Sequence, residues 1–154
     1  MKLKKFLQLF FICVFAMVSL TLTAAADTVG GNYAIRMEDM NCELIDVTKL
    51  EVLDESITRA TKSINSDIPA NKIAISDVKL PLEVGETVTI NCSYSPASAS
   101  MDFGVIAPDG YFYYLSAKEG SINQSIEVSQ RGDYSVAIRN NFSHSVTVVG
   151  FVTY

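Results

Sequence analysis

The side chains that could carry chemistry are few in this chain of 154 residues. His144 is the only histidine, and it stands between Ser143 and Ser145. Adjacency in the sequence does not make a catalytic pair, because a triad is assembled in space with a third group orienting the base. A zinc site needs three or four nitrogen or sulfur ligands. Beyond residue 26 the chain offers one histidine and two unlike cysteines, Cys42 and Cys92, which nearly excludes such a site. We therefore expect neither a metal nor another cofactor.

Carboxylates are plentiful, so counting alone leaves open an acid pair for glycoside hydrolysis. Asp102, Asp109, Glu127 and Asp133 fall at predicted strand starts and turns, where solvation and turn chemistry already explain them. No spacing of acids matches a calcium-binding loop. We expect a protein that is not an enzyme, with a small secreted glycoside hydrolase as an alternative.

The run Tyr111-Phe112-Tyr113-Tyr114 is the most informative cluster of aromatic residues. In a strand, Tyr111 and Tyr113 share one face and the other two share the opposite face. One face must belong to the core, where aromatic burial is most favourable. The other face would leave two aromatic rings at the surface, able to stack on a sugar ring or a partner. Tyr111 and Tyr113 are thus candidate ligand-binding residues, although core packing with ordinary exposed tyrosines is the simpler explanation of the run.

Of the three cysteines, Cys13 lies in the apolar run of a predicted export signal, so Cys42 and Cys92 are the two that could form a disulfide in an oxidising compartment. In the chain-entropy model a bridge that closes so long a loop stabilises by roughly 3 to 4 kcal/mol. The alternative is that Cys92 is a buried thiol that behaves as a small apolar side chain. The sequence leaves both open.

The strand predicted most clearly is the stretch GETVTINCSY, residues 85–94. Val88, Ile90, Cys92 and Tyr94 alternate with Thr and Asn residues and Ser93, which is the pattern of a strand with one buried and one wet face. Further short alternating runs follow to the C-terminus, separated by turns about every eight to twelve residues. We predict an all-β, antiparallel sandwich, immunoglobulin-like or jelly-roll-like. In its closing strand, adjacent Val148 and Val149 beside Gly150 predict a bulge.

The first 26 residues have the pattern of an export signal. Lys2, Lys4 and Lys5 precede an apolar run, and small residues at 24–26 suit a signal peptidase. Loss of these three lysines with no acids lowers the formal net charge from −5 to −8. So acidic a chain lacks the basic footprint for nucleic acid or anionic lipid. We expect a secreted protein, extracellular or in the cell envelope, with no membrane segment after signal removal.

Residues 27–57 are the least readable part of the sequence. They hold eight acids against Arg36 and Lys49, which favours a solvated segment. We predict a flexible acidic arm over residues 27–57 and the sandwich domain over residues 58–154.

Two stretches carry a resemblance to known families. GETVTINCSYS resembles the second strand of an immunoglobulin-type domain, and Gly132-Asp133-Tyr134 resembles the approach to its second cysteine, which places Tyr134 at the tyrosine corner. Val136 stands where that cysteine would be, and the chain has no tryptophan. The closing stretch GDYSVAIRNN…VTVVGFVTY is similar to bacterial secreted modules that follow peptidases and glycosidases. The chain as a whole resembles short exported β-sandwich proteins of Gram-positive gut bacteria, whose function is unassigned and which bring no catalytic residues.

These observations favour a secreted binding or interaction module. A glycan, as for a carbohydrate-binding module using exposed tyrosines, or an extracellular protein would be its partner. Because Tyr154 ends the chain within a strand-like run, self-association through an unpaired C-terminal strand is a further expectation.

Overall fold

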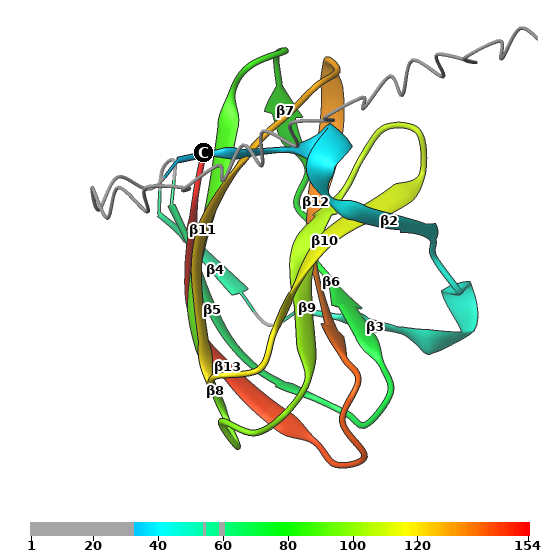
Figure 1. The fold of residues 1–154 in the computed structure, drawn as a ribbon, viewed down its shortest axis with the longest axis vertical. Helices are drawn as coiled ribbons and strands as arrows, with labels where there is room; N and C mark the ends of the chain where they lie inside the picture. The colour runs from blue at the N-terminus through cyan, green and yellow to red at the C-terminus, as the bar shows by residue number, and fades with distance from the viewer. Residues whose placement is uncertain (1–32, 54, 59–60) are drawn as a thin grey trace, which may run out of the picture. The chain divides into compact units, whose positions relative to one another are not determined.

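The computed structural model describes residues 33–53, 55–58 and 61–154 of the chain. The predicted signal peptide, residues 1–26, lies outside them. The described residues form two β-sheets packed against each other, which confirms the predicted β-sandwich (Figure 1). Their only helical elements are two short 3-10 turns, η1 (Met37–Asp39) and η2 (Val47–Lys49). In this part of the chain no helix is long and apolar enough to span a bilayer.

The two sheets are named A and B. Sheet A contains, in spatial order, β1 (Ile35–Arg36), β11 (Ser121–Glu127), β8 (Thr87–Ser95), β13 (Val146–Thr153), β5 (Thr61–Ile68) and β4 (Glu55–Thr58). Sheet B contains, in spatial order, β2 (Asn41–Leu44), β10 (Tyr111–Ala117), β9 (Met101–Ile106), β12 (Gly132–Asn140), β6 (Ile73–Ile75) and β3 (Leu50–Val52), with β7 (Leu80–Leu82) paired to the start of β12. All pairs are antiparallel except β1 with β11 and β3 with β6.

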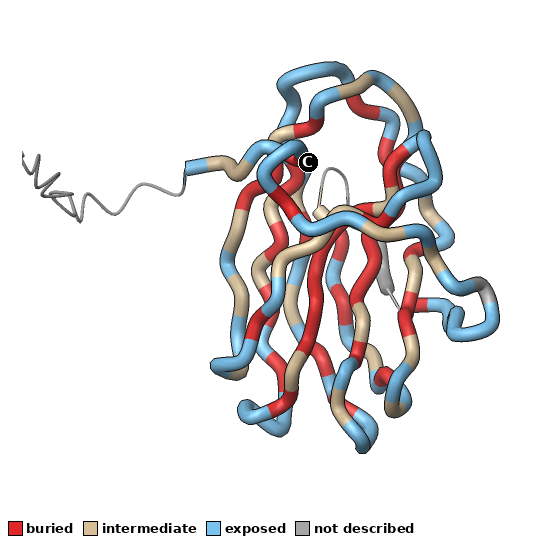
Figure 2. Tube along the Cα trace, turned by 45° about the vertical axis from the view of Figure 1, so that its right-hand side comes forward, coloured by how far each residue is buried: buried red, intermediate tan, exposed pale blue. Residues whose placement is uncertain are grey.

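Strand β8 has the predicted alternation. Its inward residues are buried, among them Val88 and Ile90, and its outward residues are partly or fully exposed. Figure 2 shows the same alternation of buried and more exposed positions along other strands. At the start of β12 the hydroxyl of Tyr134 donates to the carbonyl of Gln130 (2.7 Å), which is the bond expected of a tyrosine corner. The inward rows of both sheets thus share one apolar core.

Sheet B is covered on both faces. Its central strands β9 and β12 are buried at nearly every position, including the outward Ala137. The cover comes from residues 45–49, named here the crossing segment, because β2 and β3 lie at opposite edges of sheet B and the chain between them passes over its outer face (Figure 1). Ile45 of this segment packs on Ile73 and Phe112. Two layers of strands and one loop therefore enclose two apolar clusters.

The acidic arm predicted over residues 27–57 is not a separate arm in its described part. Strand β1 joins sheet A, and β2 and β3 form the edges of sheet B. Met37, Met40 and Leu53 are buried in the main core. The acids predicted a solvated segment, but these three buried residues stand among them and anchor the segment to the sandwich. Strand β4 (Glu55–Thr58) spans the predicted boundary between residues 57 and 58.

The bulge predicted at Val148 and Val149 is wrong. The register of β13 with β8 runs one to one from Thr147 opposite Ser95 to Thr153 opposite Thr89. Gly150 takes an inward position, where a Cβ would lie 2.2 Å from a backbone oxygen of β8, so glycine is required there without a bulge. Val149 consequently points outward.

Self-association through the C-terminal strand was predicted on the assumption of a free edge. Strand β13 lies inside sheet A and is paired with β8 on one side and β5 on the other. Its backbone groups are therefore already used, and that edge is not available for a second copy.

Candidate functional site

The two predicted ligand-binding tyrosines lie on β10 at the edge of sheet B. Asp109, in the preceding turn, accepts hydrogen bonds from the backbone N–H of Tyr111 (3.0 Å) and the hydroxyl of Tyr113 (2.8 Å). This bond to the carboxylate, helped by burial, raises the pKa of Tyr113 to about 12. Tyr113 is half-buried against the main core, whereas Tyr111 is 38 % exposed. Only Tyr111 presents much of its ring.

Tyr111 has an exposed apolar neighbour that the sequence did not indicate. Leu44 of the edge strand β2 pairs with Tyr111 and is 67 % exposed. The next residue but one, Cys42, pairs with Tyr113 and is also exposed. The tyrosine surface is thus a small patch, defined by Tyr111, Tyr113, Cys42 and Leu44.

The two cysteines are free thiols on different sheets. Cys42 is exposed on β2, and Cys92 is buried on β8. Burial raises the pKa of Cys92 to about 12, so its thiol stays protonated at neutral pH. The structure corresponds to the buried-thiol alternative for Cys92 rather than to the bridge.

The outer face of sheet B holds a cluster of charged side chains around Arg139. Its guanidinium pairs with Asp102 (Nη2 to Oδ2, 2.7 Å) and with Glu43, and lies 4.5 Å from the ring centre of Tyr114. Asp102 also accepts hydrogen bonds from Ser116 (2.5 Å) and from Asn141. Burial lowers the pKa of Arg139, because desolvation disfavours the charged guanidinium.

This cluster does not offer a hydrolytic acid pair. The side chain of Asp102 is only 3 % exposed and is engaged by three different donors, so it has no free oxygen to protonate or activate a substrate. The space beside it, between Arg139 and the crossing segment, is about 50 Å³. No group of three metal-binding side chains exists in the described part of the chain. The cluster fits the role of a packed ion-pair network.

The outer face of sheet A is different, because no layer formed by the described residues covers it. Its outward residues, by strand, are Thr61, Ser63, Asn65 and Asp67 on β5; Thr147, Val149, Phe151 and Thr153 on β13; Thr87, Thr89, Asn91, Ser93 and Ser95 on β8; and Ser121, Asn123, Ser125 and Glu127 on β11. On these four strands no outward residue is Lys or Arg, and the two acids stand at opposite corners. The remainder are short hydroxyl and amide side chains with one apolar pair. We call this surface the neutral face.

Phe151 is at the centre of the neutral face and is 42 % exposed. The register places Asn91 directly beside it on β8 and Ser63 beside it on β5, and Asn123 follows Asn91 in the same row. Val149, 45 % exposed, occupies the next row between Ser93 and Asn65. Directly opposite residues on one face have Cβ atoms about 5 Å apart. The exposed aromatic ring of Phe151 therefore has amide and hydroxyl side chains as neighbours on both sides.

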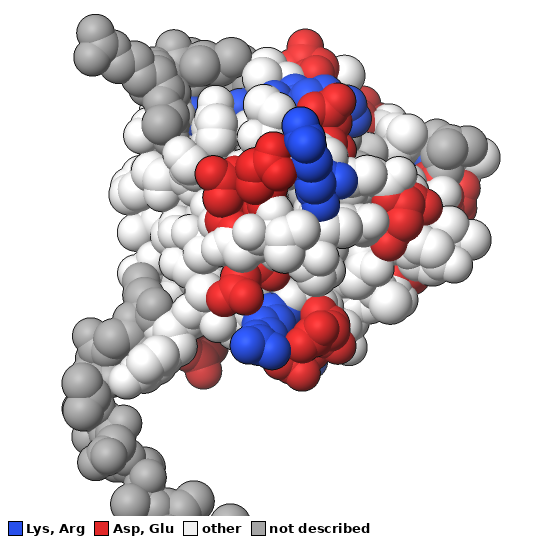
Figure 3. Space-filling view, turned by 90° about the horizontal axis from the view of Figure 1, so that it is seen from above, with Lys and Arg blue, Asp and Glu red and all other residues white. Residues whose placement is uncertain are grey.

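Charges gather instead at the end of the sandwich that carries β7. Seen from that end, acidic and basic side chains lie side by side (Figure 3). Arg131 pairs with Glu83 (3.1 Å) and Arg36 with Glu38 (3.3 Å), all four strongly exposed. The lack of charge on the neutral face is thus local and does not reflect the composition of the whole surface.

The sequence analysis missed Phe151 and Asn91 as candidate site residues. The sequence did contain a signal. Thr147, Val149, Phe151 and Thr153 are spaced two apart, so in a strand they point to one face, and the two threonines suggest that this face meets water. The predicted bulge at Val148 and Val149 broke that alternation and hid the exposed pair.

His144, the only histidine, is exposed in the loop before β13 and packs near Phe142, with ring centres 5.5 Å apart. Its Nδ1 lies 2.9 Å from the hydroxyl of Ser143. No carboxylate is bonded to this pair among the described residues, so the triad geometry is not present there.

Comparison with known proteins adds no assignment: no family model matches the chain, and no curated protein sequence is significantly similar to it.

Proposed function

We propose that this chain is a secreted, non-enzymatic binding module that holds a neutral polysaccharide on the neutral face of sheet A. The observation that carries the proposal is the exposed ring of Phe151 surrounded by Asn and Ser side chains on a surface without basic residues. An uncovered sheet face ordinarily carries charged side chains, which keep the protein soluble. Solubility therefore does not explain an exposed aromatic ring on an uncharged face.

A sugar ring has complementary chemistry. One face of a pyranose presents C–H groups that pack on an aromatic ring, while its rim presents hydroxyls that need donors and acceptors. Asn91 supplies both from beside Phe151, and Asn123 continues the row across β11. A charged polymer would find no counter-ion there. A neutral glycan is therefore favoured over an acidic one.

The strand order supports the jelly-roll alternative over the immunoglobulin-like one. From β5 to β13 the chain crosses repeatedly between the sheets, and the four central strands read β11-β8-β13-β5 in sheet A and β10-β9-β12-β6 in sheet B. The last two strands insert between earlier ones, β12 between β9 and β6 and β13 between β8 and β5, as in two interlocked Greek keys. The fold alone carries no function, and the argument stays with the neutral face.

The tyrosine surface is the second candidate for the same activity. Tyr111 and Leu44 are exposed side by side, but Tyr113 commits its hydroxyl to Asp109 and much of its ring to the core. A glycan ligand would also suit an exported protein of a gut bacterium, which the sequence resembles. The alternative of a carboxylate pair for hydrolysis is less favoured at Asp102, because three donors already engage this carboxylate.

Affinity electrophoresis in gels containing mixed-linkage β-glucan, xylan or galactomannan tests the proposal, with polygalacturonate as the charged control. We expect retardation by at least one neutral polymer. Phe151→Ala should weaken it by up to about tenfold, since an aromatic stacking contact contributes about 0.5 to 1.5 kcal/mol. Tyr111→Ala and Val84→Ala, two exposed residues elsewhere, should leave it unchanged.

The outcomes separate the candidates. Loss with Tyr111→Ala and not with Phe151→Ala would move the site to the tyrosine surface. Retardation by no neutral polymer would remove the glycan proposal for both surfaces.

A further inference from the structure

The outward side chains of the neutral face stand in rows that cross its four strands. One row contains Phe151, with Asn91 and then Asn123 on one side and Ser63 on the other. We call these four residues the Phe151 row. Neighbouring strands lie about 4.8 Å apart, so the row is about 14 Å long. It contains the one aromatic ring and two of the three amide side chains of the neutral face.

The polar groups of other rows are already paired with one another. In the row on one side, the hydroxyls of Thr89 and Ser125 lie 2.7 Å apart, within hydrogen-bond distance. At the far end of the neutral face, the hydroxyl of Thr147 donates to Asp67 (2.5 Å). Within the described residues, no hydrogen bond engages either amide of the Phe151 row. Its donors and acceptors are therefore available to a ligand.

The position of the amides indicates the direction of that ligand. A glycan lying along β13 from Phe151 would next meet Val149 or Thr153, which offer a single hydroxyl. A glycan lying across the strands would next meet Asn91 and Asn123, each with an acceptor oxygen and two donor hydrogens. The hydroxyls on the rim of a sugar need both kinds of partner. The direction across the strands is therefore favoured.

We propose that the Phe151 row binds an extended, β-1,4-linked neutral glycan laid across the strands, an inference that rests on the glycan binding proposed above. Equatorial bonds at both ends of each sugar make such a chain a flat ribbon, and one sugar unit is about as long as the spacing between strands, about 4.8 Å. Successive sugars then meet Phe151, Asn91 and Asn123 in turn. An α-1,4-linked chain contains an axial bond and coils, so it leaves a sheet surface after a short contact.

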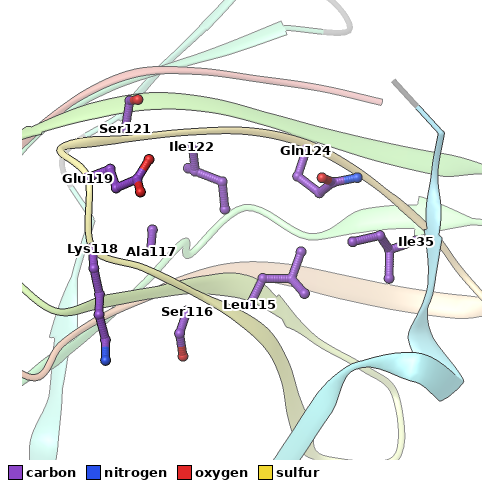
Figure 4. A pocket seen from close by; sticks show the side chains of 9 residues that line it. All are labelled: Ile35, Leu115, Ser116, Ala117, Lys118, Glu119, Ser121, Ile122 and Gln124. Carbon is purple, nitrogen blue, oxygen red and sulfur yellow. The ribbon is translucent and has the colours of Figure 1, made fainter. Parts of the chain in front are cut away.

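A groove of about 490 Å³ on the other side of β11 is the competing place for a glycan. Figure 4 shows Ile122 pointing into this groove from β11 and Leu115 from β10, with Gln124 further along β11. The described residues that line it include no aromatic ring. The amide of Gln124 already donates to the carbonyl of Tyr33 (2.9 Å). Because consecutive strand residues point to opposite faces, Gln124 is a matched control for Asn123: the same group on the same strand, facing the other way.

Isothermal titration calorimetry of the chain without residues 1–26 tests the linkage. The ligands are cellotetraose, mannotetraose and xylotetraose, with maltotetraose (α-1,4-linked) and laminaritetraose (β-1,3-linked) as controls. We expect at least one β-1,4-linked tetrasaccharide to bind about tenfold or more tightly than both controls. It should also bind about tenfold more tightly than its own disaccharide, because the further sugars reach further hydrogen-bonding side chains.

Three variants test the direction, and circular dichroism checks that each folds. Asn123→Ala should weaken binding of the tetrasaccharide about threefold or more and leave the disaccharide unchanged, because a disaccharide packed on Phe151 does not reach Asn123. Thr153→Val should have no effect, although Thr153 lies about 7 Å from Phe151 along the strand and Asn123 about 10 Å away across the sheet. Gln124→Ala should also have no effect.

The outcomes distinguish this inference from the proposed function. Equal binding of maltotetraose or laminaritetraose, or a loss with Thr153→Val or Gln124→Ala that matches the loss with Asn123→Ala, would overturn the inference and leave a neutral glycan as the ligand. No binding of any tetrasaccharide, despite retardation by a neutral polymer, would do the same. Retardation by no neutral polymer would overturn the proposed function itself, and this inference with it.

Discussion

The two outer faces of the sandwich differ in whether another segment covers them, and two phenylalanines show the difference. Phe112 and Phe151 both occupy outward positions of strands, yet Phe112 is fully buried and Phe151 is 42 % exposed. The difference lies in what covers each sheet. The crossing segment lies over sheet B and encloses Phe112 with Ile45 and Ile73, whereas nothing in the described chain covers sheet A. A covered face becomes a second core, and an uncovered one is free to bind.

Electrostatics follow the same division. The covered face contains Arg139 with two carboxylates, an arrangement that requires close partners because buried charges are costly when unpaired. The uncovered face, where charge would cost little, has almost none. Burial explains the first observation, but solubility alone does not explain the second, and this contrast is what directs attention to the neutral face.

The largest expected effect comes from replacing each phenylalanine by alanine. Phe112→Ala should lower the free energy of unfolding by about 4 kcal/mol, since it leaves a cavity in a packed cluster. Phe151→Ala removes a half-exposed ring and should cost about 1 kcal/mol or less. Urea denaturation of the two variants measures both. Similar losses would mean that the two faces are not different in packing.

The second effect concerns the buried charges. Arg139→Ala leaves Asp102 buried without its cation and should lower the free energy of unfolding by about 3 kcal/mol. The matched control is Arg131→Ala, whose ion pair with Glu83 is strongly exposed and should be worth about 0.5 kcal/mol or less. Chemical denaturation compares them. A loss below 1 kcal/mol for Arg139→Ala would show that the cluster is more open to water than its burial indicates.

A third test compares how fast the exposed thiol and the buried thiol are alkylated. Cys42 is exposed, whereas Cys92 is buried with its pKa raised to about 12. With iodoacetamide and no reductant, the folded protein produced without residues 1–26, and therefore without Cys13, should gain one alkyl group quickly and the second at least about a hundredfold more slowly, a difference of about 2.7 kcal/mol.

Intact mass after reaction in denaturant supplies the control for the thiols. Two alkyl groups are expected there. No alkylation in denaturant without reductant would mean that the two cysteines form a disulfide. Because they lie on different sheets, β2 would then have to leave its pairing with β10.

The smallest expected effect concerns the polar contacts that Lys72 makes with and near the crossing segment. Lys72 reaches Glu51 (3.6 Å) and the carbonyl of Thr48 (3.4 Å), but both charged groups are partly exposed. Lys72→Met should therefore change the free energy of unfolding by about 0.5 kcal/mol or less. A loss above 1.5 kcal/mol in urea denaturation would assign the cover to this contact rather than to apolar packing around Phe112.

Much of the fold was readable because alternation is a local property. The pattern of Val88, Ile90, Cys92 and Tyr94 predicted β8, and the turns between runs predicted a sandwich. Residues 33–53 were misread because their strands are short and lie at edges, where only a few apolar residues such as Met37 and Leu53 mark the core. So weak a pattern is outweighed by the surrounding acids when the sequence is read alone.

The candidate site was predicted only in part. Tyr111 and Tyr113 were placed correctly on one face of a strand, but how much of each ring reaches water depends on Asp109 and on the neighbouring strand β2. Phe151 was missed because exposure of an outward residue depends on whether another layer lies above it, which periodicity does not report.

The sequence by itself determined that the chain is a β-sandwich and which residues of β8 and β12 point to its core, because side chains alternate with a period of two whatever the partner strand is. Tertiary structure alone decided which outer face is covered, which side chains share a row on the neutral face, and that Arg139 meets Asp102 and Glu43. Those relations join residues far apart in the chain, and only the packing of one segment on another brings them together.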